Sequence, residues 1–280
     1  MIQTPERIVS QHNVSVAELA AAEHASLGEI GEVLPLLASP DTGRGLVRQV
    51  EAFTDGVHLY PMRGETLLLL PAALHEHFTD RLAVPPSFGY GAFSQYFLLA
   101  SIKQHAGTNA SADDVHYQRH LWRMKELCRS AQGWILDVGC DDPKIGASLL
   151  PPKARYIGLD PFCMRSKPFR LLGVAEYLPF ASGVLDGLMF NTSLDHVLDW
   201  RRGLHEAYRV LKPGATLFLC TLVWSARADL LADDVHFHHF REYDIFGALE
   251  EVGFVPQETV RYSYKDNDHR HGLYLAAKKI

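Results

Sequence analysis

The chain has few cysteines, no long hydrophobic run and no excess of positive charge, and each shortage excludes a class of protein. Its four cysteines lie so far apart that no CxxC pair exists, which excludes the usual zinc and thiol-redox motifs. The longest apolar run, Leu67–Leu74, is interrupted by Pro71 and falls short of the roughly 20 residues of a membrane-spanning helix. With a formal net charge of -6, the 280-residue chain also lacks the basic excess of a typical nucleic-acid binder.

The first residues also lack the apolar segment of a secretory signal, and they carry Glu6 and Arg7 where that segment would lie. Scattered cysteines without obvious pairing predict reduced thiols, which are typical of cytoplasmic proteins. We therefore expect a cytoplasmic protein with no membrane association.

From Trp134 onward, short apolar runs alternate with helical segments. We expect strands at 134–138, 155–159, 169–173, 187–191, 215–222, 254–264 and 272–279, and helices near 145–150, 163–167, 200–211 and 241–252. This alternation predicts an α/β fold with a mostly parallel sheet covered on both faces. No long helix separates the last two strands, which predicts an antiparallel hairpin at one edge of the sheet.

The first part of the chain has a different pattern. Residues 13–38 are rich in Ala and Glu and predict helical structure that Gly28 and Gly31 break, whereas apolar runs at 57–60 and 66–70 predict two strands joined by a turn. The chain is thus expected to divide into three parts: an N-terminal helix and hairpin module at 1–84, a helical lid or linker at 85–116, and an α/β domain at 117–280.

Two residues mark the expected ligand site, because parallel α/β sheets bind ligands beyond the carboxyl ends of their strands. Gly139 directly follows the first strand of the domain, where a glycine lets the backbone approach a ligand closely. Asp160 ends the second strand, and a carboxylate there can accept hydrogen bonds from a ribose diol. Their spacing matches the roughly 20 residues of a mononucleotide-binding unit. The GxGxxG spacing of NAD sites is absent.

Four segments, in this order, resemble the class I S-adenosylmethionine (SAM)-dependent methyltransferases. They are ILDVGCDDP at 135–143, YIGLDPF at 156–162, GVAEYLPF at 173–180 followed by LDGLMFNTSLDHVLD at 185–199, and EAYRVLKPGATLFL at 206–219. The resemblance covers about Tyr117–Ile280. It implies a Rossmann-like sheet of seven strands, SAM as the cofactor and methyl transfer as the reaction.

The resemblance also implies which residues bind SAM. Asp137, Gly139 and Cys140 would approach the methionine end, Asp160 and Pro161 the ribose, Ala175 and Glu176 the adenine, and Asn191 and Thr192 the methyl group. The sequence departs from the family's Asp-x-Gly-x-Gly-x-Gly loop at Asp141 and Pro143, and Val174 replaces an acidic residue that often binds adenine. Asp tolerates the left-handed backbone conformation better than most residues, so the loop can survive the first change.

A catalytic base is needed only if the acceptor is a hydroxyl or a protonated amine. Four of the 15 histidines, His196, His236, His238 and His239, follow the fourth and fifth strands, where a base would lie, and the candidates chosen are His238, His196 and His236. Asp233 and Asp234 could orient an imidazole. The alternative is that these histidines only cap or pack. We expect no metal, although Asp233, Asp234, His236 and His238 could also form a ligand set.

Aromatic residues provide candidates for the wall of an apolar pocket, although a place in the core is the commoner role for such residues. The candidates are Tyr90, Phe93, Tyr96, Phe97, Tyr117 and Trp224.

Residues 36–71 resemble a zinc-ribbon module that has lost its cysteines. Tyr60, Pro61 and Leu67–Pro71 match the end of its hairpin, whereas Ser39 and Thr42 stand where a CPxC pair would place its cysteines. We expect no zinc in this module. Its expected role is docking, capping of the substrate site or a dimer contact, so a homodimer is among the expected assemblies.

The resemblance and the acidic net charge favour methyl transfer from SAM to an oxygen or nitrogen of a small molecule. An RNA-modifying methyltransferase is one alternative, because a ribbon module also precedes some enzymes of that class. A non-catalytic partner with the methyltransferase fold is another, supported by the altered glycine loop. We expect a small-molecule methyl acceptor and no nucleic-acid partner.

Overall fold

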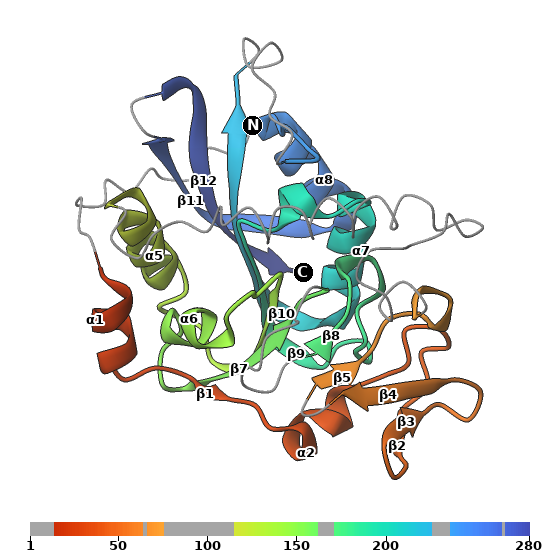
Figure 1. The fold of residues 1–280 in the computed structure, drawn as a ribbon. Helices are drawn as coiled ribbons and strands as arrows, with labels where there is room; N and C mark the ends of the chain where they lie inside the picture. The colour runs from red at the N-terminus through yellow and green to blue at the C-terminus, as the bar shows by residue number, and fades with distance from the viewer. Residues whose placement is uncertain (1–13, 64–65, 76–114, 162–170, 226–235, 265–266) are drawn as a thin grey trace.

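A computed structural model of the chain describes residues 14–63, 66–75, 115–161, 171–225, 236–264 and 267–280. Its centre is a set of adjacent parallel strands (Figure 1). In spatial order they are β10 (Leu211–Trp224), β9 (Leu185–Asn191), β6 (Gly133–Val138), β7 (Ala154–Leu159) and β8 (Leu171–Leu172). Most of their residues are buried and apolar, as is typical of parallel strands with helices on both faces.

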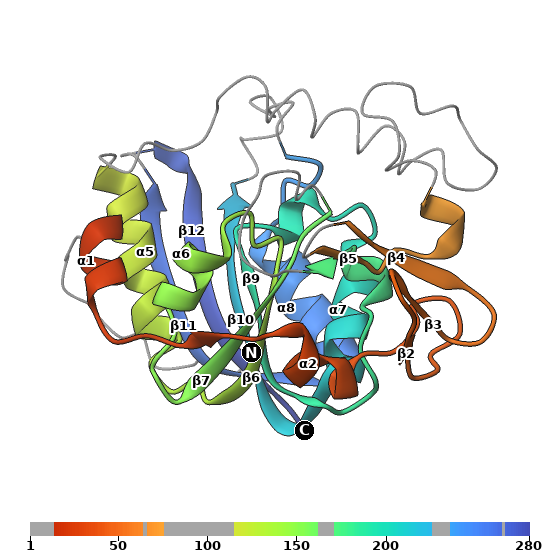
Figure 2. The ribbon, with the colours of Figure 1, turned by 60° about the horizontal axis from the view of Figure 1, so that its bottom comes forward.

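Helices cover both faces of this sheet (Figure 2). One face carries α1 (Val16–Ala21), α5 (Val115–Leu127) and α6 (Pro143–Ser148), and the other carries α7 (Trp200–Val210) and α8 (Glu242–Val252). Successive strand residues point to opposite faces. Accordingly, Ile135 packs with Leu121 of α5, whereas its neighbour Leu136 belongs to the core that contains Leu204 of α7. The predicted two-sided α/β arrangement is confirmed.

The expected edge hairpin is also present. It consists of β11 (Phe254–Tyr264) and β12 (Asn267–Lys279), which pair antiparallel, and β12 also pairs antiparallel with β10. Helix α8 leads into it and ends where Gly253 takes the left-handed conformation, with φ 104°. Glycine adopts this conformation without a Cβ clash, so the helix stops at the position the sequence predicts.

The expectation of seven strands was wrong for the sheet as a whole, to which the described residues contribute twelve strands. Seven strands come from residues 117–280. The N-terminal part then continues the same sheet through β5 (Thr66–Leu68), β4 (Leu59–Arg63), β3 (Ala52–Thr54) and β2 (Val47–Arg48), while β1 (Ser26–Leu27) pairs with β7. The physical reason is that β5 pairs parallel with β8, whose backbone would otherwise form an open sheet edge.

The helical structure expected at 13–38 is only partly present. After α1, the chain forms β1, then the short helix α2 (Ile30–Val33) and a 3-10 turn, η1 (Leu34–Leu36). Gly28 explains the break, because its N–H donates to the Tyr156 carbonyl at 2.7 Å and a Cβ would lie 2.8 Å from the Trp134 ring. The segment is therefore held extended against β7.

The predicted hairpin of the N-terminal part is confirmed as the antiparallel pair β4 and β5, in which Met62 faces Leu67. Most of the expected lid at 85–116 and the short helix at 163–167 lie outside the described residues. Within the described residues, no helix is both long enough and apolar enough to cross a membrane.

Candidate functional site

The carboxyl ends of β6, β7 and β9 are joined by hydrogen bonds that bring the predicted cofactor residues together. The N–H of Gly139 donates to the carbonyl of Leu159 at 2.8 Å, which ties the turn after β6 to the end of β7. The hydroxyl of Ser193, which follows β9, donates to the carbonyl of Val138. Asp137, Gly139 and Cys140 thus lie beside Asp160 and Pro161, with Asn191 and Thr192 on the neighbouring strand end.

The turn after β6 can be built only with Gly139 at its start. This residue has φ 81°, and a Cβ there would lie 2.5 Å from the Cβ of Ser193. Asp141 follows with φ 42°, and its N–H donates to Asp160 Oδ2 at 3.0 Å. Asp141 therefore keeps the left-handed conformation that a glycine of the family loop would have, and the Asp160 carboxylate holds it in place.

The next two residues of the loop, Asp142 and the second departure Pro143, also have local explanations. Asp142 caps α6, since its side chain accepts a hydrogen bond from the N–H of Lys144 at 3.1 Å. Pro143 occupies the first helical position, where its missing N–H costs no intrahelical hydrogen bond. Asp142 and Pro143 thus form a capped start of α6.

Asp137 is buried beneath this turn, with a 1% exposed surface. Its Oδ2 accepts a hydrogen bond from the Tyr156 hydroxyl at 2.7 Å, and its Oδ1 has no partner among the described residues. The pKa of Asp137 is raised to about 7. Burial is the main cause and the nearby charge of Asp160 adds to it, whereas the hydrogen bond from Tyr156 lowers the pKa. The site therefore contains a buried acceptor that suits a cationic donor.

The two residues expected along the adenine, Ala175 and Glu176, lie in the 3-10 turn η3 (Ala175–Tyr177) after β8, and both are buried. Oε1 of Glu176 accepts a hydrogen bond from the N–H of Asp199 at 3.1 Å. Burial raises the pKa of Glu176, although backbone hydrogen bonds oppose this shift. The Glu176 carboxylate is thus engaged with the residue that caps α7.

Two of the three predicted base candidates lie together around a carboxylate that sequence reasoning missed. Asp195, in the 3-10 turn η4 (Leu194–His196), has a side chain that is only 3% exposed. His236 Nε2 lies 3.7 Å from Asp195 Oδ2, and His196 Nε2 lies 4.0 Å from Asp195 Oδ1. The two imidazole rings stack with centroids 5.1 Å apart. Hereafter these three residues are called the histidine–aspartate cluster.

His238 has a different environment. Its Nε2 lies 2.8 Å from the carbonyl oxygen of Val197, so this nitrogen carries the proton and donates it to the backbone. Its ring stacks on Phe240, with centroids 5.6 Å apart. The structure thus holds His238 against the loop that follows β9, whereas Asp233 and Asp234 lie outside the described residues.

The sequence reading also missed His120 of α5. Its Nδ1 lies 2.9 Å from the Tyr274 hydroxyl, and its ring lies 6.3 Å from that of Tyr117. Desolvation of the ring lowers the pKa of His120 to about 4, although a hydrogen bond with Asn191 opposes the shift. The spacing of Tyr117 and His120 places both on one helix face and could have indicated this pairing.

Of the aromatic pocket candidates, Trp224 lies beside the histidine–aspartate cluster. Its ring centroid is 4.6 Å from that of His239 and 6.3 Å from that of His236. Burial, together with the charges of Asp141 and Asp142, raises the pKa of Tyr117. The remaining candidates, Tyr90, Phe93, Tyr96 and Phe97, lie outside the described residues.

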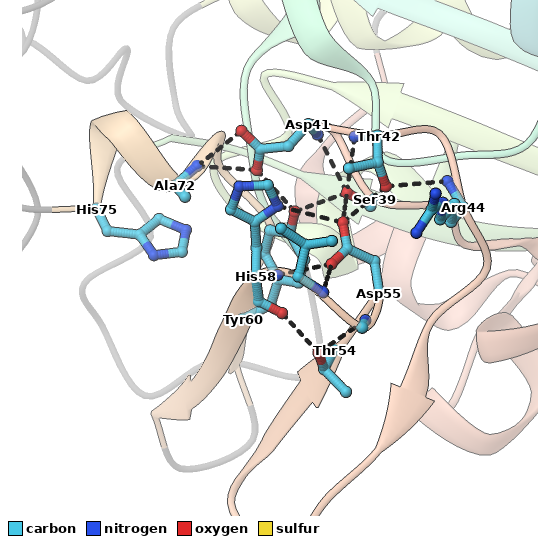
Figure 3. A network of polar contacts seen from close by, with 12 residues as sticks. Ser39, Asp41, Thr42, Arg44, Thr54, Asp55, His58, Tyr60, Ala72 and His75 are labelled. Atoms are coloured by element: carbon cyan, nitrogen blue, oxygen red, sulfur yellow. Dashed lines mark hydrogen bonds and ion pairs between the residues drawn. The ribbon is translucent and has the colours of Figure 1, made fainter.

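The positions expected for ribbon cysteines form a hydrogen-bonded network instead (Figure 3). The hydroxyls of Ser39 and Thr42 donate to Asp55 Oδ2 at 2.6 and 2.7 Å, and His58 Nδ1 lies 3.3 Å from the same oxygen. The Tyr60 hydroxyl donates to Asp41 Oδ2 at 2.6 Å. A buried carboxylate, that of Asp55, thus lies at the centre of this network.

Comparisons with known proteins agree with this geometry. Residues 136–219 match the family model described as a methyltransferase domain. A demethylmenaquinone methyltransferase of Mycolicibacterium vanbaalenii is 41% identical over 51 residues, which are 18% of this chain and 22% of that protein. An uncharacterized methyltransferase of Mycobacteroides abscessus is 29% identical over 126 residues, or 40% of this chain and 48% of that protein. The chain therefore matches less than half the length of either relative.

The fold has solved counterparts. One is the 1,6-didemethyltoxoflavin-N1-methyltransferase of Burkholderia thailandensis, solved with 1,6-didemethyltoxoflavin and S-adenosylhomocysteine. It is 17% identical to this chain with a TM-score of 0.50, and the match covers 72% of this chain and 98% of that one. Residues 136–219 therefore match a methyltransferase domain, and the described α/β part of the chain shares the fold of this solved methyltransferase.

Proposed function

We propose that the protein is a SAM-dependent methyltransferase that acts on an oxygen or nitrogen of a small molecule. The observation that carries the proposal is the joined set of strand ends around Gly139 and Asp160. It lies within the segment that matches the methyltransferase domain. Ligands of parallel α/β sheets bind at this edge, so the fold and the local geometry support the same site.

The residues present fit SAM at this edge. The buried Oδ1 of Asp137 offers an acceptor for the methionine ammonium, and Gly139 supplies the positive φ that the turn beside it requires. Beyond them, Cys140 would flank the methionine, Asp160 and Pro161 would hold the ribose, Ala175 and Glu176 would border the adenine, and Asn191 and Thr192 would lie near the methyl group. Because the Glu176 carboxylate already accepts a hydrogen bond from the backbone of Asp199, Glu176 would line the adenine pocket by its shape.

When bound, SAM supplies a methyl group on a sulfonium that is already a good leaving group. The main task of the chain is then to hold an acceptor in line with that methyl group at near-attack distance. A base is needed only for a hydroxyl or a protonated amine. His196 and His236 would be the candidates for such a base, whereas the His238 ring is bonded to the Val197 carbonyl and would hold their loop.

A small-molecule acceptor is supported by the net charge of -6, which disfavours a phosphate backbone as the partner. Two of the similar proteins are named for small acceptors, demethylmenaquinone and 1,6-didemethyltoxoflavin. An RNA substrate would instead require binding whose affinity falls steeply with salt. Association of the ribbon-like module with a substrate or with a second copy of the chain remains part of this proposal.

The test is a calorimetric titration with S-adenosylhomocysteine. We expect the wild-type protein to bind it, and Asp160→Ala and Asp160→Asn to weaken binding about tenfold or more, since each removes a hydrogen-bonded carboxylate. Glu250→Gln, an exposed change on α8, is the matched control and should bind as the wild type does. The far-UV circular dichroism of each variant establishes that it is folded.

Two results would contradict the proposal: no binding by the wild-type protein, or undiminished binding by both Asp160 variants. The non-catalytic alternative predicts a different combination, in which the cofactor product binds but no acceptor in an extract of the native source receives a labelled methyl group.

A further inference from the structure

We propose that the histidine–aspartate cluster is a binding site for a divalent transition metal, with Zn²⁺ as its best match. Asp195, His196 and His236 each offer one ligand atom, and these atoms all lie within 4.8 Å of one another. The site lies just beyond the carboxyl end of β9, where the methyl acceptor of the proposed function would bind. It differs from the set around Asp233 and Asp234 that the sequence suggested.

The distances distinguish a metal site from a histidine base that a carboxylate orients. An imidazole N–H donates to a carboxylate at about 2.7–2.9 Å, which is much shorter than the 3.7 and 4.0 Å found for His236 and His196. Zn²⁺ bonds of roughly 2.0–2.2 Å in a tetrahedral shell place neighbouring ligand atoms about 3.4 Å apart. The distance from each histidine nitrogen to its nearer Asp195 oxygen is therefore close to the distance between two ligand atoms that share a metal.

Both oxygens of Asp195 take part in this arrangement, one facing each histidine. A base dyad uses a single imidazole, whereas here two stacked rings point their Nε2 atoms toward the same buried carboxylate. A metal ion that contacts the carboxylate and both imidazole nitrogens would bind without protonation of either ring.

The backbone holds the two contributing segments in register, although 40 positions separate the two histidines. The N–H groups of Phe237 and His238 both donate to the backbone carbonyl of Asp195, at 3.1 and 3.2 Å. His236 is therefore fixed beside η4 by main-chain contacts, independently of its own side chain. Such preorganisation is what a metal site needs, since its ligands must be within a few tenths of an ångström of their bonding positions.

The ligand types select the metal. Two imidazole nitrogens and one carboxylate oxygen suit Zn²⁺ and its first-row neighbours, whereas Mg²⁺ and Ca²⁺ prefer shells made of oxygen. Three protein ligands also leave a coordination position open, as in catalytic rather than structural zinc sites. The open position would take an oxygen of the acceptor.

The role of that open position rests on the proposed function, although metal binding itself does not. A hydroxyl bound to Zn²⁺ loses its proton to solvent more readily than a free one. The oxygen would then form a bond to the methyl carbon as the bond from that carbon to sulfur breaks, leaving S-adenosylhomocysteine and the methyl ether. This role would favour a hydroxyl over an amine as the acceptor group.

The experiment uses the full chain, freed of metal by dialysis against a chelator. Zn²⁺ binding is measured by calorimetry, and Co²⁺ binding by its visible absorption, whose intensity reports the coordination geometry. We expect one equivalent of each metal to bind. Asp195→Asn, His196→Ala and His236→Ala should each weaken binding at least tenfold and change the Co²⁺ spectrum. His205→Ala, an exposed histidine of α7, should leave both readouts unchanged.

The proposal is overturned if the wild-type protein does not bind Zn²⁺ at micromolar concentration. It is also overturned if the His196→Ala, His236→Ala double variant binds Zn²⁺ as tightly as the wild type, because the metal would then occupy other histidines. Titration of S-adenosylhomocysteine into the same samples separates the two proposals. Binding of Zn²⁺ without binding of S-adenosylhomocysteine would contradict only the proposed function. Binding of S-adenosylhomocysteine without binding of Zn²⁺ would contradict only the metal site.

Discussion

At the scale of single residues, Asp137 carries the clearest consequence of the fold. It lies near the end of β6, a parallel strand with both faces covered. Its carboxyl group accepts one hydrogen bond, from the Tyr156 hydroxyl. Its pKa rises from 3.8 to about 7 because burial disfavours the charged form. Above pH 4 the folded state therefore binds a proton that the unfolded state has lost, and the stability that this proton confers disappears as the pH rises toward 7.

We expect Asp137→Asn to remove this dependence. Relative to the variant, the unliganded wild-type protein should lose up to about 3 kcal/mol of unfolding free energy between pH 5 and pH 8, at about 1.4 kcal/mol per pKa unit. Urea unfolding at several pH values measures the difference. Glu250→Gln, which neutralises an exposed carboxylate, should follow the wild-type profile. Parallel profiles for the wild type and Asp137→Asn would show that Asp137 is not responsible.

At the scale of elements, the turn around Asp55 stabilises β3 and β4 of the ribbon-like module. The carboxylate accepts the N–H groups of Val57 and His58 on Oδ1 and the hydroxyls of Ser39 and Thr42 on Oδ2. Burial alone would raise its pKa, but these hydrogen bonds to the charged form outweigh it and hold the pKa well below its usual range.

Asp55→Asn should destabilise this turn, because an amide presents two N–H donors to groups that are themselves donors. We expect a loss of about 2–3 kcal/mol of unfolding free energy at pH 7. The folded-state pKa is lowered, so the contribution of Asp55 is present above about pH 4 and is lost as the pH falls below it. The gap between wild type and variant, measured by urea unfolding, should therefore shrink toward pH 3. A constant gap, or an equal loss for the exposed change Glu51→Gln, would contradict this account.

At the scale of the whole molecule, the N-terminal strands and the α/β part share one sheet and one core. Phe53 and Tyr60 belong to the same cluster of buried residues as Leu171 and Phe180. The continuity depends on the parallel pairing of β5 with β8, which joins Leu67 and Leu68 to Leu171 and Leu172. The division at residue 84 that the sequence predicts would therefore separate segments that are packed together.

A core change in the N-terminal strands should consequently destabilise the whole chain. All four tryptophans lie beyond residue 116, so their fluorescence reports on the α/β part rather than on β2 to β5 themselves. Phe53→Ala should cost roughly 3 kcal/mol, or about 6–12 °C in melting temperature. The tryptophan-monitored midpoint should fall together with the one from circular dichroism. Val50→Ala, at a position that is 96% exposed, is the control. An unchanged tryptophan midpoint in Phe53→Ala would show that the module unfolds separately.

Much of the α/β architecture could be predicted because it depends on patterns among residues that are close in sequence. Ile135 and Leu136 belong to a short apolar run, Asp199 caps α7, and Gly253 ends α8, and each signal involves only nearby residues. The ends of β6 and β7 could also be located, since adjacent parallel strands bring their carboxyl ends together. The positions of Gly139 and Asp160 followed from that rule, and that of Asp137 from the family resemblance.

The alternating strands and helices, and the edge of the sheet at which a ligand would bind, can thus be predicted from local periodicity and capping. Contacts in the folded chain are needed to find that β5 extends the sheet, that Glu176 binds the start of α7, and that Asp195 faces both His196 and His236. These outcomes depend on contacts between distant segments. Which distant segments meet is decided by packing and by the pairing of free backbone groups, and neither leaves a periodic signal in the chain.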